Sequence, residues 1–289
     1  MDNNISWIDL HIHTTASDGT YSPAQIVTHA EELNLHAISV TDHDTVSGTI
    51  EVLKTGSKSV SIISGIEISS FPPLQYRDAI SGSFHILGYD FDPFDSELNK
   101  MLQKLRDGRE NRNPLIVKKL NDLGFDITLE EIKKISGGQV GRPHIANVML
   151  KKGYVKSITE AFDVYIAQGA KAHVGKFRPE SKVVIDLIKN AGGIPVLAHP
   201  GLLNISDNRF QNLILELKDY GLMGIEAYYS RHNKEKTDFY INCAKKNKLL
   251  VTGGSDFHGD NKENIKMGEG TGDLVVPVEL FHPLNRRKK

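Results

Sequence analysis

The residues Ile8-Asp9-Leu10-His11-Ile12-His13-Thr14-Thr15-Ala16-Ser17-Asp18-Gly19 set the pattern that the rest of the chain repeats. An apolar run leads into His11 and His13, and Asp18 follows five residues later. In an extended segment residues i and i+2 point to the same side, so both imidazoles can aim at one point. A turn at Gly19 can bring Asp18 back toward them. The stretch indicates a strand that ends at a metal site, although a His-x-His pair alone also occurs on half-buried strands.

The length and composition fit a globular protein. With 289 residues, 39% hydrophobic and 25% charged, the chain can form one large α/β domain, with or without an insertion. The formal net charge of -1 gives no global positive field to attract long nucleic acid. The sequence contains no apolar run of about 18 residues, so we expect a cytoplasmic protein with no membrane partner. The single cysteine, Cys243, excludes an intrachain disulfide framework and is expected to be structural.

Strand-like runs alternate with helical patterns along most of the chain, which favours a largely parallel sheet built from strand–helix units. A helix is expected to begin at Ser22-Pro23, where an N-cap residue precedes a proline. Seven strands are expected, at residues 8–12, 37–40, 60–63 continuing into 65–68, 84–89, 194–198, 224–228 and 249–252.

The rhythm changes between about residues 92 and 179, where apolar residues fall at helical spacing with little strand signal. We therefore expect a metal-binding unit formed by residues 1–91 and 180–289, with a helical insertion at 92–179. One basic cluster of the insertion is expected to be a solvated face, although spacing alone leaves a functional role open. This cluster consists of Arg106, Arg109 and Arg112.

A potential metal ligand stands at the end of nearly every expected strand. The carboxyl ends of parallel strands in an α/β barrel share one face, so ligands scattered over the sequence would meet in space. One buried histidine at a strand end is usually a satisfied core residue, but its recurrence is hard to explain that way. The mixture of imidazoles and carboxylates suits Mn, Fe or Zn better than Ca. The candidate ligands are His11, His13, Asp18, His43, Glu67, His85, His199, Asp256 and His258.

These residues lie in motifs that together resemble the PHP (polymerase and histidinol phosphatase) family. In chain order the motifs are His-Ile-His with Ser-Asp-Gly, Thr-Asp-His-Asp, Gly-Ile-Glu-Ile, His-Ile-Leu-Gly-Tyr, Leu-Ala-His-Pro-Gly and Gly-Ser-Asp-Phe-His. The resemblance covers essentially the whole chain. It implies a distorted seven-stranded (β/α)7 barrel with a centre of three divalent metal ions.

The resemblance also implies how the ligands are shared among the ions. The first ion would be held by His11, His13, Glu67 and Asp256. Glu67 would bridge to a second ion held by His85 and His199. The third would be held by Asp18, His43 and His258. We expect Mn²⁺, with Fe²⁺ or Zn²⁺ as alternatives.

Three segments resemble a bacterial branch of the family. Its characterised members remove the 3′-phosphate from nucleoside 3′,5′-bisphosphates, and some degrade short RNA from the 5′ end. The segments are Gly141-Arg142-Pro143-His144-Ile145-Ala146, Gly169-Ala170-Lys171-Ala172-His173-Val174 and Glu226-Ala227-Tyr228-Tyr229-Ser230-Arg231-His232. The loop at residues 71–83 is longer than the usual connection, so it could reshape the rim of the site.

Divalent ions a few ångströms apart can activate water and hold a phosphoryl group at once. We expect a metal-activated hydroxide to attack phosphorus, while the second phosphate of a bisphosphate needs its own holder. Arg142 is the candidate because a planar guanidinium can bind an anion bidentately. Pro143 suits the first position of a helix, whose free N–H groups favour an anion. An ordinary loop charge is the alternative for Arg142.

Four further polar residues have open roles. His144 could contact substrate or cap local packing. His232 could protonate the leaving oxygen or bind phosphate, and a plain surface histidine is the alternative. Asp42 and Asp9 could orient neighbouring ligands, although a buried hydrogen-bonding role also fits Asp9.

The expected function is that of a metal-dependent phosphoesterase acting on a small phosphorylated nucleotide or short RNA. A phosphatase of histidinol phosphate or another metabolite is an alternative, against which the helical insertion argues. A non-catalytic metal-binding module is a third possibility, but it would be expected to lack ligands, and none of the nine is missing. Ligand identity alone also permits a metal-dependent amidohydrolase.

Overall fold

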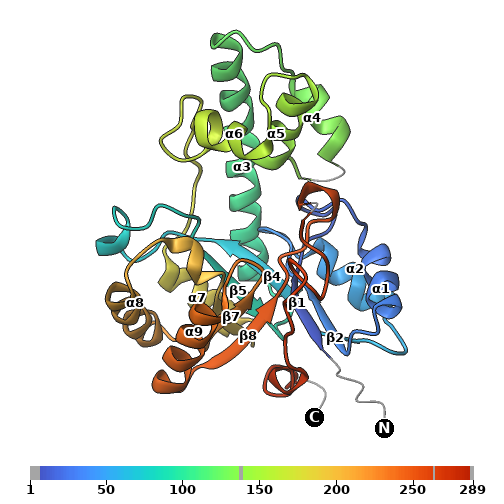
Figure 1. Cartoon of the computed structure of the whole chain (residues 1–289), viewed down its shortest axis with the longest axis vertical. Coiled ribbons are helices and arrows are strands. Elements are labelled where there is room, and N and C mark those ends of the chain that lie inside the picture. The colour runs from blue at the N-terminus through green and yellow to red at the C-terminus, as the bar shows by residue number, and fades with distance from the viewer. Residues whose placement is uncertain (1–6, 137–138, 263, 287–289) are drawn as a thin grey trace.

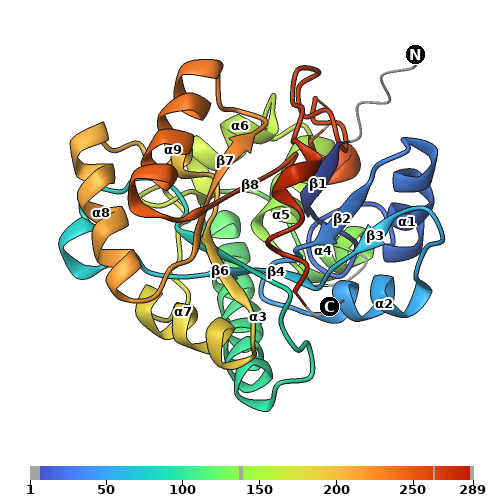
Figure 2. The ribbon, with the colours of Figure 1, turned by 90° about the horizontal axis from the view of Figure 1, so that it is seen from below.

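The chain folds into two β-sheets with helices packed around them (Figures 1 and 2). The computed structural model describes residues 7–136, 139–262 and 264–286. The described strands are β1 (Ile8–Ile12), β2 (Ala37–Val40), β3 (Ser61–Ile62), β4 (Gly65–Ser69), β5 (His85–Tyr89), β6 (Ile194–Leu197), β7 (Gly224–Tyr229) and β8 (Leu250–Gly254).

The first sheet is parallel and has the order β1-β2-β3, whereas the second is mixed and has the order β4-β5-β6-β7-β8. Isolated bridges link the two sheets at both edges. Ile12 bridges to Phe257 just after β8, and His43 just after β2 bridges to Glu67 in β4. A Cβ atom at Gly254 would lie only 2.3 Å from the His11 nitrogen, so glycine is needed where β8 approaches β1.

The α/β class predicted from the sequence is confirmed, but the seven-stranded barrel is not. The described residues form eight strands in two sheets, without a continuous closed ladder. Residues 60–63 and 65–68, expected as one strand, belong to different sheets. The chain changes pairing partner at Ser64, whose hydroxyl donates to the Phe91 carbonyl (2.7 Å). Hydrophobic periodicity does not show that a strand changes its pairing partner at a single residue.

Strand β5 also departs from the expected parallel arrangement. It runs antiparallel to both neighbours, β4 and β6. Residues 71–83 return the chain directly from β4 to β5, with only a short 3₁₀ turn at Leu74–Tyr76. As a result His85 lies at the beginning of its strand, not at the end. The reversed direction still places it at the edge where the parallel strands finish.

Helices α1 (Pro23–Glu32) and α2 (Ser47–Thr55) flank the first sheet (Figure 1). The α1 N-terminus is capped as the sequence predicts: Ser22 Oγ accepts from Gln25 N (3.3 Å), and Gln25 Oε1 accepts from Ser22 N (2.8 Å). The second sheet is flanked by α7 (Ser181–Asn190), α8 (Asp207–Asp219) and α9 (Lys234–Asn247). Cys243 is buried in α9, as expected for a structural thiol. Among the described residues no helix is long and apolar enough to cross a membrane.

A group of helices rises above the sheets (Figure 1). It comprises α3 (Ser96–Asp122), α4 (Leu129–Ser136), α5 (Arg142–Lys151), α6 (Ile158–Glu160) and a π-helical turn (Ala161–Ile166). The upper part has its own apolar core, drawn from residues between Ile116 and Ala172. The lower half of α3 instead packs into the core of the second sheet through Leu98, Leu102 and Leu105. The division into residues 1–91 and 180–289 on one side and 92–179 on the other stays a prediction.

The basic cluster on α3 is not a solvated face, contrary to the sequence-based expectation. Arg109 is 8% exposed and Arg112 is 4% exposed, while Arg106 is half-buried. The reason lies in the loop after β2. Buried Asp44 accepts from Arg109 Nε (3.0 Å) and Nη2 (2.6 Å), which draws this part of α3 against the sheets. A partner so distant in sequence cannot be read from helical spacing.

Candidate metal centre

All nine candidate ligands lie together at one edge of the sheets. His11 belongs to β1 and His13 follows it, while His43 follows β2. Glu67 lies within β4, His85 begins β5, and the remaining strand-end ligands follow β6 and β8. Seven of the nine are buried, and His43 and His85 are partly buried. The central prediction from the sequence, that ligands from distant strands converge, is therefore met by the geometry.

Glu67 is the hub of the cluster. Its Oε2 lies 3.4 Å from His11 Nε2, 3.2 Å from His13 Nε2 and 2.9 Å from His43 Nδ1. Its Oε1 lies 2.6 Å from His85 Nδ1 and 2.7 Å from His199 Nε2. One carboxylate thus faces five imidazoles, with its two oxygens directed at different groups of them.

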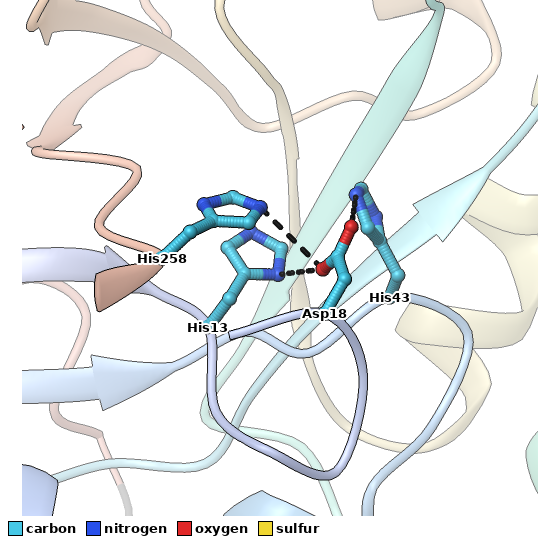
Figure 3. Close-up of side chains that lie close together, drawn as sticks. All are labelled: His13, Asp18, His43 and His258. Carbon is cyan, nitrogen blue, oxygen red and sulfur yellow. Dashed lines mark ion pairs between the residues drawn. The ribbon is translucent and has the colours of Figure 1, made fainter. Parts of the chain in front are cut away.

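Asp18 gathers a second set of imidazoles (Figure 3). Its carboxylate oxygens lie 3.5 Å from His13 Nδ1, 3.9 Å from His43 Nε2 and 3.4 Å from His258 Nε2. Asp18 reaches this position because the chain turns back after β1, with Gly19 N donating to the Thr14 carbonyl (2.9 Å). The turn inferred from the glycine therefore has the expected effect.

Asp256 completes the cluster from the end of β8. Its Oδ1 lies 3.6 Å from His11 Nε2, 3.4 Å from His13 Nε2 and 3.4 Å from His258 Nδ1. Asp256 has φ +58° and His199 has φ +29°, conformations that non-glycine residues rarely adopt. Strained backbone at two candidate ligands is typical of functional sites.

The unpaired atoms of this cluster fit a metal centre. Four buried atoms have no hydrogen-bond partner among the residues that the structure describes, although they face one another: His11 Nε2, His13 Nε2, His43 Nδ1 and Glu67 Oε2. Buried polar atoms without partners are costly unless a ligand satisfies them. Three groups have ligand atoms within 4.8 Å of one another and could each hold an ion. The groups are His13, Asp18, His43 and His258; His11, His13 and Asp256; and His43, Glu67 and His85.

Protonation in the cluster follows from burial and from neighbouring charges. Burial would raise the pKa of Glu67, but the charges of the His43 and His11 imidazoles hold that pKa well below its usual value. Burial, together with the Lys262 charge, lowers the pKa of His258 to about 4. Burial also lowers the pKa of His85 to about 3. The Glu67 carboxylate is therefore ionised and the His85 and His258 rings are neutral, the forms that bind metal ions. Burial would lower the pKa of His13, but the carboxylates of Asp256 and Glu67 raise that pKa to about 9, so a metal ion there would displace a proton.

Three residues that support the ligands were not picked out from the sequence. Buried Glu226, in β7, has Oε1 2.8 Å from His11 Nδ1 and accepts from the His199 backbone N–H through Oε2 (2.6 Å). Tyr229 Oη (2.9 Å) and Lys262 Nζ (2.6 Å) both donate to Asp256 Oδ2. A carboxylate inside the apolar strand Gly-Ile-Glu-Ala-Tyr-Tyr was the signal that could have revealed Glu226.

Two other aspartates support the backbone around the ligands. Asp9 accepts from the His11, Ser255 and Gly268 backbone N–H groups, so it has the buried hydrogen-bonding role that the sequence left open. Asp42 accepts from Thr14 N (2.8 Å) and from Ser17 Oγ (2.5 Å). It thereby fixes the turn that carries Asp18.

The three candidate substrate residues lie at two places, Arg142 and His144 in the first turn of α5 and His232 after β7. Arg142 begins α5 and donates through Nη1 to the Ile166 carbonyl (3.1 Å). His144 is buried, and its Nδ1 accepts from Gly141 N (2.9 Å), which is the capping role. His232 Nδ1 donates to the Ala227 carbonyl (2.8 Å), and His232 Nε2 accepts from Gly201 N (3.1 Å). Burial also lowers the pKa of His232 to about 4, so the geometry favours a positioning role over proton donation.

Next to the metal centre lies a cluster of cations that has too few carboxylates. We call Arg109, Arg112, Arg142, Lys176 and Arg178 the cationic cluster. Asp44 alone pairs with two of them, Arg109 (2.6 Å) and Lys176 (2.8 Å). Within the described residues no carboxylate lies within ion-pair distance of Arg112, Arg142 or Arg178. Burial and the charges of neighbouring arginines lower the pKa of Arg112 to about 8.

The cationic cluster borders the metal centre on two sides. Asp44, which anchors two of its members, directly follows His43 in the sequence. The α5 N-terminus lies beside Asp18, since a Cβ atom at Gly141 would be 3.9 Å from Asp18 Cβ. Asn261 links the same elements by donating to the Asp18 carbonyl (2.8 Å) and accepting from Asn147 Nδ2 (2.7 Å).

Buried imidazoles and carboxylates at one edge of an α/β fold define the class of metal-dependent hydrolases. A family model narrows the class: the PHP domain model matches residues 9–191, more than half of the chain. The chain belongs to the PHP domain family, which confirms the resemblance seen in the sequence motifs.

Individual relatives are similar over nearly their whole length. The 5′-3′ exoribonuclease of Haemophilus influenzae is 32% identical over 280 residues, which cover 93% of this chain and 97% of that protein. The 3′,5′-nucleoside bisphosphate phosphatase of Chromobacterium violaceum is 26% identical over 270 residues, 92% of each chain. A solved structure assigned as a metal-dependent phosphoesterase of Bifidobacterium adolescentis superposes with a TM-score of 0.84. It is 27% identical and covers 96% of this chain and 95% of that chain.

The fold, the site and these relatives together establish a PHP-family metal-dependent phosphoesterase, a hydrolase of phosphate esters. The side-chain groups described above are able to bind metal.

Proposed function

We propose that this enzyme hydrolyses a phosphate ester of a small nucleotide. Its substrates would be a nucleoside 3′,5′-bisphosphate, converted to the 5′-monophosphate, or the 5′ end of a short RNA. The names of the two relatives above support these two substrates. The observation that carries the proposal is the cationic cluster, with its unpaired arginines, directly beside the metal centre. A substrate with one reacting phosphate and one held phosphate needs two such sites side by side.

The nine candidate ligands would hold divalent ions, three per chain in our proposal, with Mn²⁺ preferred over Fe²⁺ or Zn²⁺. Such ions activate water and neutralise phosphoryl oxygens. Glu67 is suited to bridge two ions because its two oxygens face different imidazoles. The assignment of ligands differs in detail from the resemblance: His13 also faces Asp18, and His43 also faces Glu67.

The chain's own residues prepare these ligands. Glu226 fixes the His11 ring by bonding Nδ1, which leaves Nε2 directed at Glu67 and Asp256. Tyr229 and Lys262 occupy one oxygen of Asp256, which leaves the other oxygen facing the imidazoles. Hydrogen bonds of this kind orient metal ligands and select their tautomers.

The second phosphate would be held by the cationic cluster. Arg142, predicted from the sequence, is joined there by Arg112 and Arg178. A buried guanidinium without an acid partner is destabilising, and a phosphate dianion would relieve that cost with charge-assisted hydrogen bonds. The same reasoning disfavours phosphorylated metabolites that carry no second anion, such as histidinol phosphate. His144 and His232 then act by holding the α5 N-terminus and the chain after β6 in place.

The test compares three substrates under identical conditions. Purified enzyme with Mn²⁺ is given adenosine 3′,5′-bisphosphate, a 5′-phosphorylated RNA trinucleotide and histidinol phosphate, and the His13→Ala variant serves as control. We expect turnover of the first two and none by the variant. Preferential turnover of histidinol phosphate would overturn the nucleotide assignment, and equal activity of the variant would overturn the metal site.

A further inference from the structure

The cationic cluster carries more positive charge than one phosphate needs. Asp44 carries one negative charge and pairs with both Arg109 and Lys176. These three residues together therefore keep one positive charge. Arg112, Arg142 and Arg178 add three more, because none of them has a carboxylate within ion-pair distance among the described residues. A phosphate monoester supplies at most two negative charges near neutral pH. The surplus points to a more highly charged occupant.

A groove lies along helix α3, beside residues that follow Arg112 in the helix. It has a volume of about 530 Å³ and is lined by Leu115, Lys118, Lys119, Asp122 and His173 together with Val174 and Gly175. Arg112, Leu115 and Lys119 follow one another at i, i+3 and i+7, so they share one side of the helix. The groove and the buried Arg112 therefore lie along the same stripe of α3.

The segment at residues 173–178 forms the opposite wall. Lys119 Nζ donates to the His173 carbonyl (2.8 Å) at the outer end, and a Cβ atom at Gly108 would lie 3.4 Å from Phe177 Cβ at the inner end. Lys176 lies on this segment and reaches Asp44. Burial, and after it the charges of Arg142 and Arg178, lower the pKa of His173.

We propose that this groove holds the outer phosphates of a nucleotide whose 5′ substituent is a diphosphate or a triphosphate. The inference rests on the proposed function, because the inner phosphate of that chain would occupy the cationic cluster. Lys118 is exposed, and Lys119 lies about 10 Å beyond Arg112 along the helix axis at 1.5 Å per residue. A chain of phosphates starting at Arg112 and Arg178 would extend toward these lysines. Positive charge along the path matches an extended polyanion.

The reaction itself is unchanged by this occupant. Water attacks the 3′ phosphorus, the bond from phosphorus to the 3′ oxygen breaks, and the 3′ oxygen takes a proton. The products are inorganic phosphate and the nucleoside 5′-triphosphate, with the 5′ chain intact. The triphosphate acts only as a recognition group.

The experiment measures kcat/KM of the Mn²⁺-loaded enzyme for adenosine 3′,5′-bisphosphate and for adenosine 3′-phosphate 5′-triphosphate, with products identified by chromatography. We expect the triphosphate compound to be hydrolysed at least as efficiently as the bisphosphate. In the Lys118→Gln/Lys119→Gln variant its kcat/KM should fall about fivefold, as for two charge contacts at an exposed site, while the bisphosphate changes less than about twofold. The single variant Lys118→Gln leaves the Lys119 contact to His173 intact and should show part of the effect.

A matched control is Lys245→Gln/Lys246→Gln, which removes two exposed lysines from the end of α9. This control should affect neither substrate. Rejection of the triphosphate compound by an enzyme that hydrolyses the bisphosphate would overturn the inference and leave the proposed function standing. Failure on both substrates would instead overturn the proposed function. Equal losses of kcat/KM on both substrates in the double lysine variant would also contradict a polyphosphate site. So would an equal loss on a substrate that is extended by a nucleoside instead of by phosphates.

Discussion

The metal centre and the cationic cluster lie side by side but lack opposite charges. The metal centre lacks a cation, and the cationic cluster lacks an anion. In the metal centre, His11 Nε2, His13 Nε2 and Glu67 Oε2 have no hydrogen-bond partner among the described residues, which favours a cation as the missing partner. In the cationic cluster, no described carboxylate lies within ion-pair distance of Arg112, Arg142 or Arg178, which favours an anion. A phosphate ester bound through metal ions, with a second phosphate nearby, satisfies both regions at once. This difference supports our proposal that the site accommodates two phosphates.

The largest effect is expected at the hub of the metal centre. Glu67→Gln removes the charge that faces five imidazoles, so metal binding and activity should be lost together. Metal stabilisation of transition-state charge is worth several kcal/mol, so kcat should fall by at least about 100-fold. Manganese content by atomic emission and phosphate release report the two losses. Retention of both activity and metal in the variant would contradict the role of the hub.

The next effect is on stability, at the residue that joins the two regions. Asp44→Asn leaves Arg109 and Lys176 buried without their acid partner, and breaking a buried pair in this way costs about 3–5 kcal/mol. We expect the free energy of unfolding, measured by urea denaturation, to fall by about that amount. Asp78, exposed in the loop before β5, has no ion pair with any described residue, so Asp78→Asn serves as control. An unchanged midpoint for Asp44→Asn would mean that the cationic cluster does not depend on this anchor.

Glu226 provides a finer test of the metal centre. In Glu226→Gln the His11 ring loses its charged partner but keeps a side chain of the same shape, so metal affinity should fall about 10- to 100-fold. Titration with Mn²⁺ followed by calorimetry gives the affinity without relying on turnover. The exposed Glu235→Gln in α9 is the matched control. An affinity equal to that of the parent would show that Glu226 only packs in the core.

The smallest effect is expected in the cationic cluster and depends on the substrate. Arg112→Met should lower kcat/KM for adenosine 3′,5′-bisphosphate about 10-fold, because a hydrogen bond to a charged group contributes about 1.5–3 kcal/mol. Hydrolysis of adenosine 3′-monophosphate should stay unchanged, since it has no 5′ phosphate to hold. The free energy of unfolding should not decrease, because the variant removes a buried cation without an acid partner. Equal losses on both substrates would argue for a general structural role of Arg112.

The sequence predicted the metal centre better than it predicted the cationic cluster, for a physical reason. Ligands such as His11, His43 and His199 stand at the ends of apolar runs, and the direction of parallel strands then brings them to one edge. His85 lies with the other candidate ligands although its strand runs the other way, because a reversed strand presents its first residue at that edge. Strand direction, the break at Ser64 and the division into two sheets depend on pairing, which periodicity does not encode.

The cationic cluster depends on contacts between segments far apart in sequence. Arg109 and Lys176 are separated by 67 positions in the numbering and meet only at Asp44. Helical spacing therefore indicated a solvated face where the fold buries two arginines. Arg142 was singled out from its motif and Arg112 was named only within the basic cluster of α3, whereas Arg178 was not singled out. Glu226 was missed for a similar reason, since its partners His11 and His199 lie on other strands.

The most direct test of the two-phosphate account is a crystal structure with Mn²⁺ and adenosine 5′-monophosphate, the expected product, using anomalous scattering at the manganese edge. The account predicts manganese peaks among Glu67, Asp18 and Asp256, with the 5′ phosphate bonded to Arg112, Arg142 or Arg178. Manganese peaks located away from these carboxylates, or a product phosphate that leaves all three arginines unpaired, would contradict it.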